Sequence, residues 1–113
     1  MSAITTHVLD TARGRPAAGL GVRLERRDGG GWSLLAERAT DADGRVRDLL
    51  AVDAVPAAGT YRLTFDTGAY LAAPGAAVFY PEVAVVFEIH DPSRHHHVPL
   101  LLSPYGYTTY RGS

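Results

Sequence analysis

Apolar and polar residues alternate along much of this chain, and a period of two is typical of half-buried β-strands. In residues 82–90 the apolar face consists of Val83, Val85, Phe87 and Ile89. In residues 61–66 it consists of Tyr61, Leu63 and Phe65. The same reasoning predicts further strands at residues 4–11, 20–27, 32–40, 45–50, 95–102 and 105–110.

Turn-forming residues separate these segments. The Asp-Gly-Gly-Gly run at residues 28–31 predicts a hairpin, and Asp-Ala-Asp-Gly at 41–44 predicts a tight turn. Residues 91–93 form another turn, so we expect 95–102 to run back against 82–90. Residues 67–73 have helical character, with Thr67 as the expected N-cap and Pro74 as a block to continuation.

About eight short strands and one brief helix predict an all-β fold, an antiparallel β-sandwich of two sheets. The chain has 113 residues. That length is enough for one core, so we expect a single domain over residues 1–113.

The C-terminal segment, residues 97–113, has two unusual features. Val98, Leu100 and Leu102 share one face of its strand, while His97 and Leu101 share the other. An imidazole and a leucine on that second face indicate that it is covered as well. The tail then carries three tyrosines, Tyr105, Tyr107 and Tyr110, and ends in Arg-Gly-Ser. We expect this terminus to be tied into the structure, because aromatic rings are costly to leave in solvent.

Composition narrows the possible functions. The formal net charge of −1 gives no reason to expect nucleic acid or an acidic membrane as a partner. The absence of cysteine excludes disulfides, thiolate zinc sites and a cysteine nucleophile. No apolar run is long enough to span a membrane, and no signal-peptide pattern precedes the first strand, so a cytoplasmic protein is expected. All cationic residues are arginine, which favours a GC-rich bacterial source.

The five histidines are the main candidates for chemistry. His95 and His97 project from the same face of a strand, and His7 is a possible third metal ligand. A metal site at these histidines is disfavoured, because no carboxylates or cysteines accompany them as ligands. Taken alone, His7 also suits a hydrogen-bonded structural role, and Arg45 a solvated charge. His90, at a strand end without any motif, is expected to be solvated.

Four blocks of sequence, in order, resemble the 5-hydroxyisourate hydrolases, the transthyretin-related enzymes of purine breakdown. They are residues 7–11 (His-Val-Leu-Asp-Thr), 40–45 (Thr-Asp-Ala-Asp-Gly-Arg), 79–82 (Phe-Tyr-Pro-Glu) and 97–113, which ends in Tyr-Arg-Gly-Ser. The resemblance implies a transthyretin-like sandwich and a homotetramer with active sites at the dimer–dimer contact. It also implies that no metal or other cofactor takes part.

The resemblance carries over His7, Arg45 and His97 as catalytic residues. His7, Arg45, Tyr110 and Ser113 are implied to bind the substrate. One departure is His96, because family members often have tyrosine between two histidines. Alternation points it away from His97, so it is expected to affect packing.

The implied reaction opens the ring of 5-hydroxyisourate to 2-oxo-4-hydroxy-4-carboxy-5-ureidoimidazoline. Arg45 would stabilise the oxyanion, and a histidine would activate water. His7 is favoured as the base with His97 orienting water, although the residues themselves do not rank the two. Two alternatives remain: a transthyretin-like carrier of a small ligand without catalysis, and a metal-binding or adhesive β-sandwich.

Overall fold

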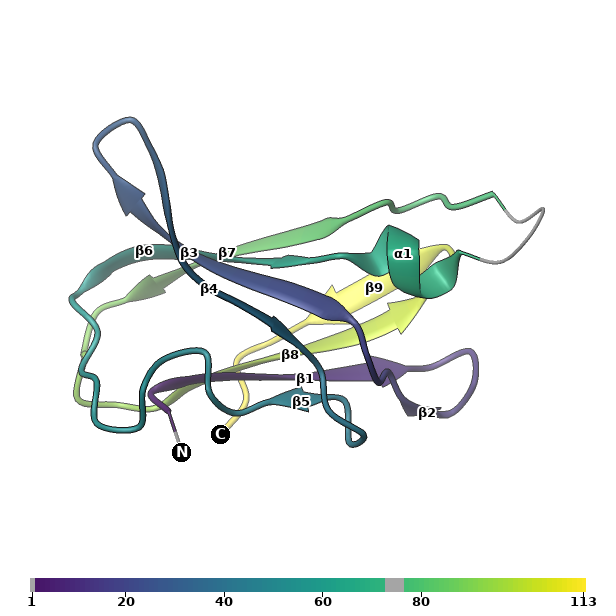
Figure 1. Cartoon of the computed structure of the whole chain (residues 1–113), viewed down its shortest axis with the longest axis horizontal. Coiled ribbons are helices and arrows are strands. Elements are labelled where there is room, and N and C mark those ends of the chain that lie inside the picture. The colour runs from purple at the N-terminus through teal and green to yellow at the C-terminus, as the bar shows by residue number, and fades with distance from the viewer. Residues whose placement is uncertain (1, 73–76) are drawn as a thin grey trace.

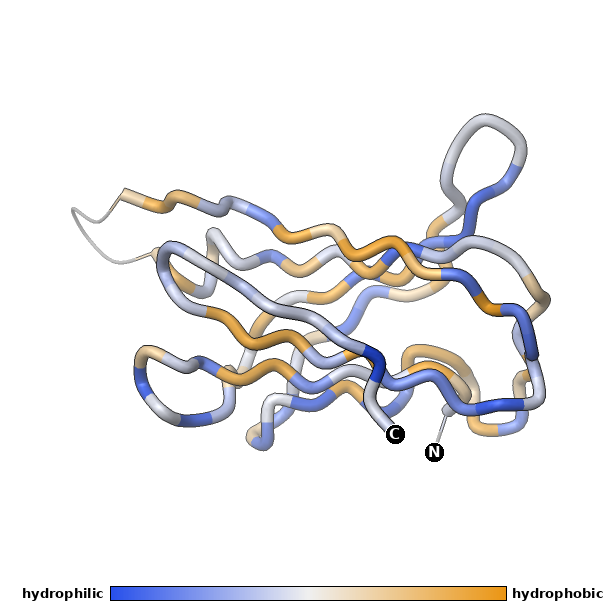
Figure 2. The backbone as a smooth tube through the Cα atoms, turned by 180° about the vertical axis from the view of Figure 1, so that it is seen from behind, coloured by the Kyte–Doolittle hydropathy of each residue, from blue (hydrophilic) through white to orange (hydrophobic). Residues whose placement is uncertain are grey.

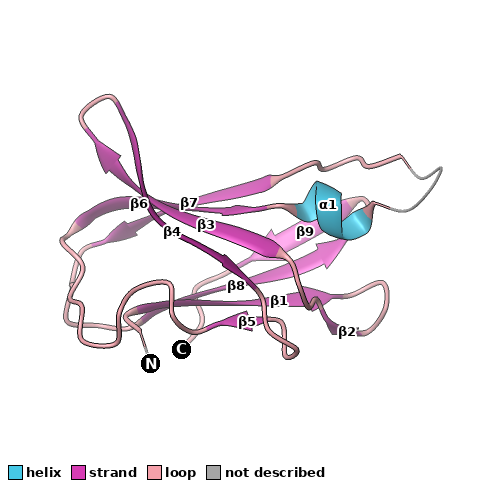
Figure 3. Ribbon diagram, viewed as in Figure 1, coloured by secondary structure: helices cyan, strands magenta, loops and turns pink. Residues whose placement is uncertain are grey.

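The computed structural model describes residues 2–72 and 77–113. Its elements, in chain order, are β1 (Ile4–Asp10), β2 (Arg15–Pro16), β3 (Gly21–Asp28), β4 (Gly31–Ala39), β5 (Arg45–Val46), β6 (Gly59–Phe65), α1 (Thr67–Leu71), β7 (Val83–Ile89), β8 (His96–Ser103) and β9 (Gly106–Thr109). The strands form two sheets that pack face to face, with α1 at one end (Figures 1 and 3). The predicted β-sandwich of two sheets with one short helix is therefore confirmed.

One sheet has the order β2-β1-β8-β9, with β5 also paired to β1, and is called the site sheet below. The other has the order β4-β3-β6-β7 and is called the opposite sheet. Between them lies a core of alternating apolar side chains from both sheets, which includes Val8, Leu24, Leu63, Phe65 and Leu100. Figure 2 shows hydrophobic stretches running along the facing strands, as the alternation predicts.

The predicted hairpin at residues 28–31 is confirmed, since β3 and β4 pair up to Asp28 and Gly31. The prediction that residues 95–102 run back against 82–90 is wrong. The chain crosses to the site sheet after β7, and β8 pairs with β1 and β9. The β1–β8 pair is also parallel, within a fold otherwise built from antiparallel pairs among the described residues. Local alternation specifies faces but not partners, which is why this neighbour was missed.

Two local predictions need correction. The strand expected at residues 45–50 is only Arg45–Val46. The helix is capped by Asp66, whose carboxylate accepts from the Ala69 amide, and not by Thr67. The Thr67 side chain is instead fully buried and donates to the Tyr80 carbonyl at 2.7 Å. The predicted helix end at residue 73 and its Pro74 block lie outside the described residues.

The helix among the described residues spans one turn and a half at most, far less than a bilayer requires.

Candidate active site

Three adjacent strands bring the predicted catalytic residues together on the outer face of the site sheet. In the antiparallel pair of β1 and β5, His7 lies opposite Arg45. In the parallel pair of β1 and β8, Thr5 lies opposite His97. Thr5 and His7 are two residues apart on β1 and so share a face. The strand register alone therefore assembles one polar cluster from segments far apart in the sequence (Figure 1).

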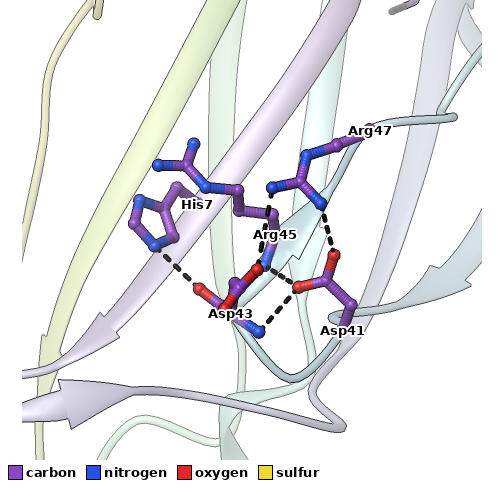
Figure 4. Close-up of polar contacts among 5 residues, drawn as sticks. All are labelled: His7, Asp41, Asp43, Arg45 and Arg47. Atoms are coloured by element: carbon purple, nitrogen blue, oxygen red, sulfur yellow. Dashed lines mark hydrogen bonds and ion pairs between the residues drawn. The ribbon is translucent and has the colours of Figure 1, made fainter.

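Arg45 is held by the tight turn that precedes it. The Asp41 carboxylate accepts hydrogen bonds from the backbone amides of Asp43 and Arg45, both at 2.9 Å, and pairs with Arg47 at 3.1 Å (Figure 4). The Arg45 amide bond, followed by the Asp43 amide and the Arg47 charge, lowers the pKa of Asp41, although desolvation opposes this. An ionised Asp41 thus ties down both ends of the turn.

Gly44 allows this turn to dock against β1. Its φ is +75°, in the left-handed region, and a Cβ there would lie 2.4 Å from the Val8 carbonyl oxygen. The close approach permits the Val8 amide to donate to the Gly44 carbonyl at 2.7 Å. The turn predicted from Asp-x-Asp-Gly is confirmed, and its physical role is to bring Arg45 beside His7.

The tautomer of His7 follows from its hydrogen bond. Nε2 lies 2.8 Å from the Asp43 carbonyl oxygen, an atom that only accepts (Figure 4). Nε2 therefore carries a proton and donates it. A neutral His7 then keeps its lone pair on Nδ1. The same turn that positions Arg45 thus also orients the imidazole of His7.

Several basic side chains surround His97. Its Nδ1 is 2.8 Å from the Thr5 hydroxyl, and the His95 Nε2 is 2.9 Å from that same oxygen. Burial first, then the charges of Arg45, His95 and His7, lower the pKa of His97 below its ordinary value. His97 is therefore neutral near pH 7 and able to accept a proton.

The C-terminal tail crosses over His97. The Gly112 amide donates to the His97 carbonyl at 2.8 Å, so the tail is tied in as predicted. A Cβ at Gly112 would lie 2.6 Å from Cδ2 of the His97 ring, so only glycine lets the tail pass this closely. This role for Gly112 was not predicted, because the contact joins segments that sequence spacing does not relate.

A cleft opens over this cluster, and its lining consists of Thr5, Thr6, Arg45, Arg47, His95, His97 and Ser113. Arg45, His97 and Ser113 of the predicted site thus meet in one cleft, with His7 next to Arg45. Tyr110 does not line it. It is 54% exposed and borders a second cleft with Phe87, Val98 and Arg111. Thr5, two residues before His7 on the same face of β1, was missed as a site residue.

The other histidines behave as the sequence predicted. His96 points away from His97 and is buried, and its Nδ1 donates to the Arg94 carbonyl at 2.9 Å. Burial, the largest effect, lowers the pKa of His96. His90 is exposed at the end of β7. Within residues 2–72 and 77–113, no three His, Cys, Asp or Glu side chains are grouped as metal ligands.

Comparison with known proteins agrees with the sequence motifs. The model of the HIUase/Transthyretin family matches residues 4–112. The 5-hydroxyisourate hydrolase of Caulobacter vibrioides is 51% identical over the full length of both chains. Among solved structures, Klebsiella pneumoniae 5-hydroxyisourate hydrolase covers 100% of both chains at 39% identity with a TM-score of 0.86. Sea bream transthyretin, solved with thyroxine, is 35% identical with a TM-score of 0.89, covering 97% of this chain and 94% of its own.

The family model spans nearly the whole chain, and the Caulobacter relative matches this chain over its full length. The chain therefore belongs to the HIUase/Transthyretin family.

Proposed function

We propose that this protein is a hydrolase of urate breakdown that opens the six-membered ring of 5-hydroxyisourate to 2-oxo-4-hydroxy-4-carboxy-5-ureidoimidazoline. The observation that carries the proposal is the cleft in which Arg45 meets His97. Among the described residues Arg45 forms no ion pair, so its charge is available to a substrate. The 51% identity to a 5-hydroxyisourate hydrolase supports the choice of substrate.

In the proposed reaction, water attacks a ring carbonyl carbon and loses a proton to a histidine. The new C–O bond places negative charge on the carbonyl oxygen, and the planar Arg45 guanidinium opposes that charge. The C–N bond of the ring then breaks, and the histidine returns its proton to the departing nitrogen. Atoms and charge balance without any further reactant, and we propose that no metal or cofactor is required.

We assign the base to His97 and give His7 the positioning role, which reverses the order favoured on sequence alone. His97 lines the cleft, its pKa is lowered, and no partner for its Nε2 is found in the described part of the chain. His7 is anchored through Nε2 to the turn, so its Nδ1 can accept a hydrogen bond from water or substrate. Ser113 would close the cleft from the tail side.

We further propose a homotetramer in which another subunit covers the outer face of the site sheet. Leu9 and Leu101 lie opposite each other on this face and are half-exposed. A polar cleft flanked by apolar side chains suits a contact between copies better than a surface facing water. Light scattering tests this assembly, and a fully active monomer would contradict a site built between subunits.

The alternative, a carrier of a small ligand, is compatible with the fold, since the transthyretin neighbour has a TM-score as high as the hydrolase neighbour. The site residues favour the enzyme. A carrier has no need of an unpaired arginine beside a histidine whose pKa is lowered.

The test is direct. 5-Hydroxyisourate is generated from urate by a urate oxidase, the protein is added in catalytic amount, and the ultraviolet decay of the intermediate is followed. We expect accelerated decay that survives EDTA. Unchanged decay would favour the carrier. Acceleration that EDTA abolishes and zinc restores would instead make the histidine cluster a metal site.

A further inference from the structure

Thr5 lies between two imidazoles of the cleft. It is only 4% exposed, and its hydroxyl oxygen is 2.8 Å from Nδ1 of His97 and 2.9 Å from Nε2 of His95. The two rings lie nearly parallel, 21° apart, with centroids separated by 6.2 Å. Both rings line the cleft, but His97 is half-buried whereas His95 is exposed to solvent. The hydroxyl therefore connects a half-buried histidine with a solvent-exposed one.

The number of available protons restricts the hydrogen-bonding states of Thr5 and the two imidazoles. A hydroxyl has one proton to donate and two lone pairs. If both rings donated to Thr5, its own proton would need a third acceptor, and none is found among the described residues. If both rings accepted, one would be left without a hydrogen. Thr5 must therefore accept from one ring and donate to the other, which couples the tautomers of His95 and His97.

We propose that Thr5 relays protons between His97 and solvent by way of His95. This inference rests on the proposed function, with His97 as the base. Before attack, His97 donates from Nδ1 to Thr5, Thr5 donates to Nε2 of His95, and Nε2 of His97 has a free lone pair. After His97 takes a proton from water at Nε2, its Nδ1 proton passes to Thr5 and the Thr5 proton passes to His95. His97 is then neutral, and His95 carries the positive charge.

The electrostatics of the cleft favour this transfer. The basic groups around His97 are Arg45 from β5, His7 from β1 and His95 beside it, with Arg47 lining the same cleft and Arg111 in the tail. Ser113 of the tail also lines this side of the cleft. A proton held on His97 is therefore partly desolvated and close to the Arg45 cation, and both effects lower the pKa of His97. On exposed His95 the same charge is hydrated.

The first experiment measures tautomers directly and does not need activity. Nitrogen NMR of histidine-labelled protein above the titration range distinguishes a proton on Nδ1 from one on Nε2. The proton count allows Nδ1–H on both rings or Nε2–H on both, and the relay requires Nδ1–H on both. Nε2–H on both rings would leave Nε2 of His97 without a lone pair for the proton of water, and would overturn the relay. Mixed tautomers, with one ring protonated on each kind of nitrogen, would overturn the relay.

The second experiment compares variants by the pH profile of kcat/KM. Thr5→Val keeps the shape of the side chain but removes the hydroxyl, and we expect a loss of about 10- to 100-fold with a shifted profile. Thr5→Ser restores the hydroxyl and should stay within about threefold of the parent. Thr11→Val is the matched control. It removes a hydroxyl that donates to the Leu102 carbonyl, and it should leave the pH profile of kcat/KM unchanged.

The third experiment uses a double-mutant cycle. His95→Ala should lose about as much as Thr5→Val, and the double variant should be no worse than either, because both changes interrupt one path. Imidazole added to His95→Ala should recover part of the rate, since it can reach the vacated exposed position. Additive losses, or an absence of rescue, would overturn the relay. If the parent protein itself failed to accelerate decay, the proposed function would fall, and the tautomer measurement would still decide the coupling.

Discussion

The outer faces of the two sheets both carry arginines beside flat rings, but their charges are arranged differently. On the opposite sheet, Arg62 pairs with Glu25 at 2.9 Å and stacks over Trp32 at 4.3 Å from the ring centroid. Arg27 lies over the same ring at 4.8 Å. On the site sheet, Arg45 has no carboxylate partner within the described residues, and the imidazoles beside it bind a hydroxyl and a carbonyl.

The comparison teaches how to separate structural from functional charge in one small fold. Arg62 and Glu25 satisfy each other, so this pair needs nothing from outside the chain. Arg45 instead adds to the positive charge around His97 and lowers its pKa, an arrangement that costs stability unless an anion binds there. We propose that this unneutralised arginine beside a neutral imidazole is the part of the surface adapted to chemistry.

The strongest test of this comparison substitutes Arg45 on the site sheet and, as a control, Arg62 on the opposite sheet. Arg45→Ala should lower kcat/KM by at least about 100-fold, because the developing oxyanion loses its cation. His97→Asn should lower it similarly, through loss of the base. His7→Asn is expected to reach about the same scale. Activity is measured by decay of 5-hydroxyisourate, with a thermal melt to confirm folding.

Arg62→Ala is the matched control from the opposite sheet. It should leave kcat/KM within about twofold and cost about 1 kcal/mol of stability, from the lost ion pair and ring contact. His90→Asn and His96→Tyr should likewise keep most of the activity. Equal losses for Arg62→Ala and Arg45→Ala would show that the charge comparison does not distinguish the two faces.

Removing Tyr110, Arg111, Gly112 and Ser113 tests the tail. The deletion takes away the bridge to His97 and the Ser113 side of the cleft, but none of the buried apolar core. We expect kcat/KM to collapse while the protein still melts cooperatively. A truncated protein that turns over normally would leave the tail a structural strand end. A C-terminal tag after Ser113 should act in the same direction.

Gly112→Ala is a finer version of the same test. A Cβ would meet the His97 ring at 2.6 Å, so the ring or the tail must move. We expect a loss of about tenfold in kcat/KM, since small misplacement of a catalytic group is costly. Gly30→Ala, in the hairpin turn where a Cβ meets nothing within 4 Å, is the control and should have no effect. Full activity in Gly112→Ala would mean that the close approach is not needed.

The smallest expected effect is on the stability of the fold at acid pH. Burial lowers the pKa of His96 in the folded state, so below about pH 6.5 the unfolded chain binds more protons. The free energy of unfolding therefore falls as pH falls through that value. His96→Tyr removes this group, and its Tm should drop less between pH 7.5 and 5.5, by about 2 °C. His97 contributes in the same direction, so part of the acid loss should remain. An unchanged drop would mean that His96 titrates alike in both states.

Much of the fold followed from sequence, and the reason is that strand faces are local. Alternation in residues 61–66 and 82–90 correctly placed Tyr61, Leu63, Val83 and Ile89 against the core. The choice of which strands pair, in contrast, is not determined by local sequence. The parallel pairing of β8 with β1 joins segments about 90 residues apart, and no turn signal marks it. The cap of α1 was misplaced by one residue, because Asp66 and Thr67 are both good caps and only the burial of Thr67 decides between them.

The sequence by itself determined which residue types the site contains, because His7, Arg45 and His97 stand in motifs that identify the family. Tertiary structure decided how these residues are placed relative to one another. The register of β5, β1 and β8 sets His7 opposite Arg45 and His97 opposite Thr5, and the tail turns Gly112 onto the His97 ring. Protonation states depend on these through-space contacts, since the pKa of His97 responds to burial and to charges on other strands. A linear motif specifies an imidazole, but only its surroundings in the folded chain set the pKa of that imidazole.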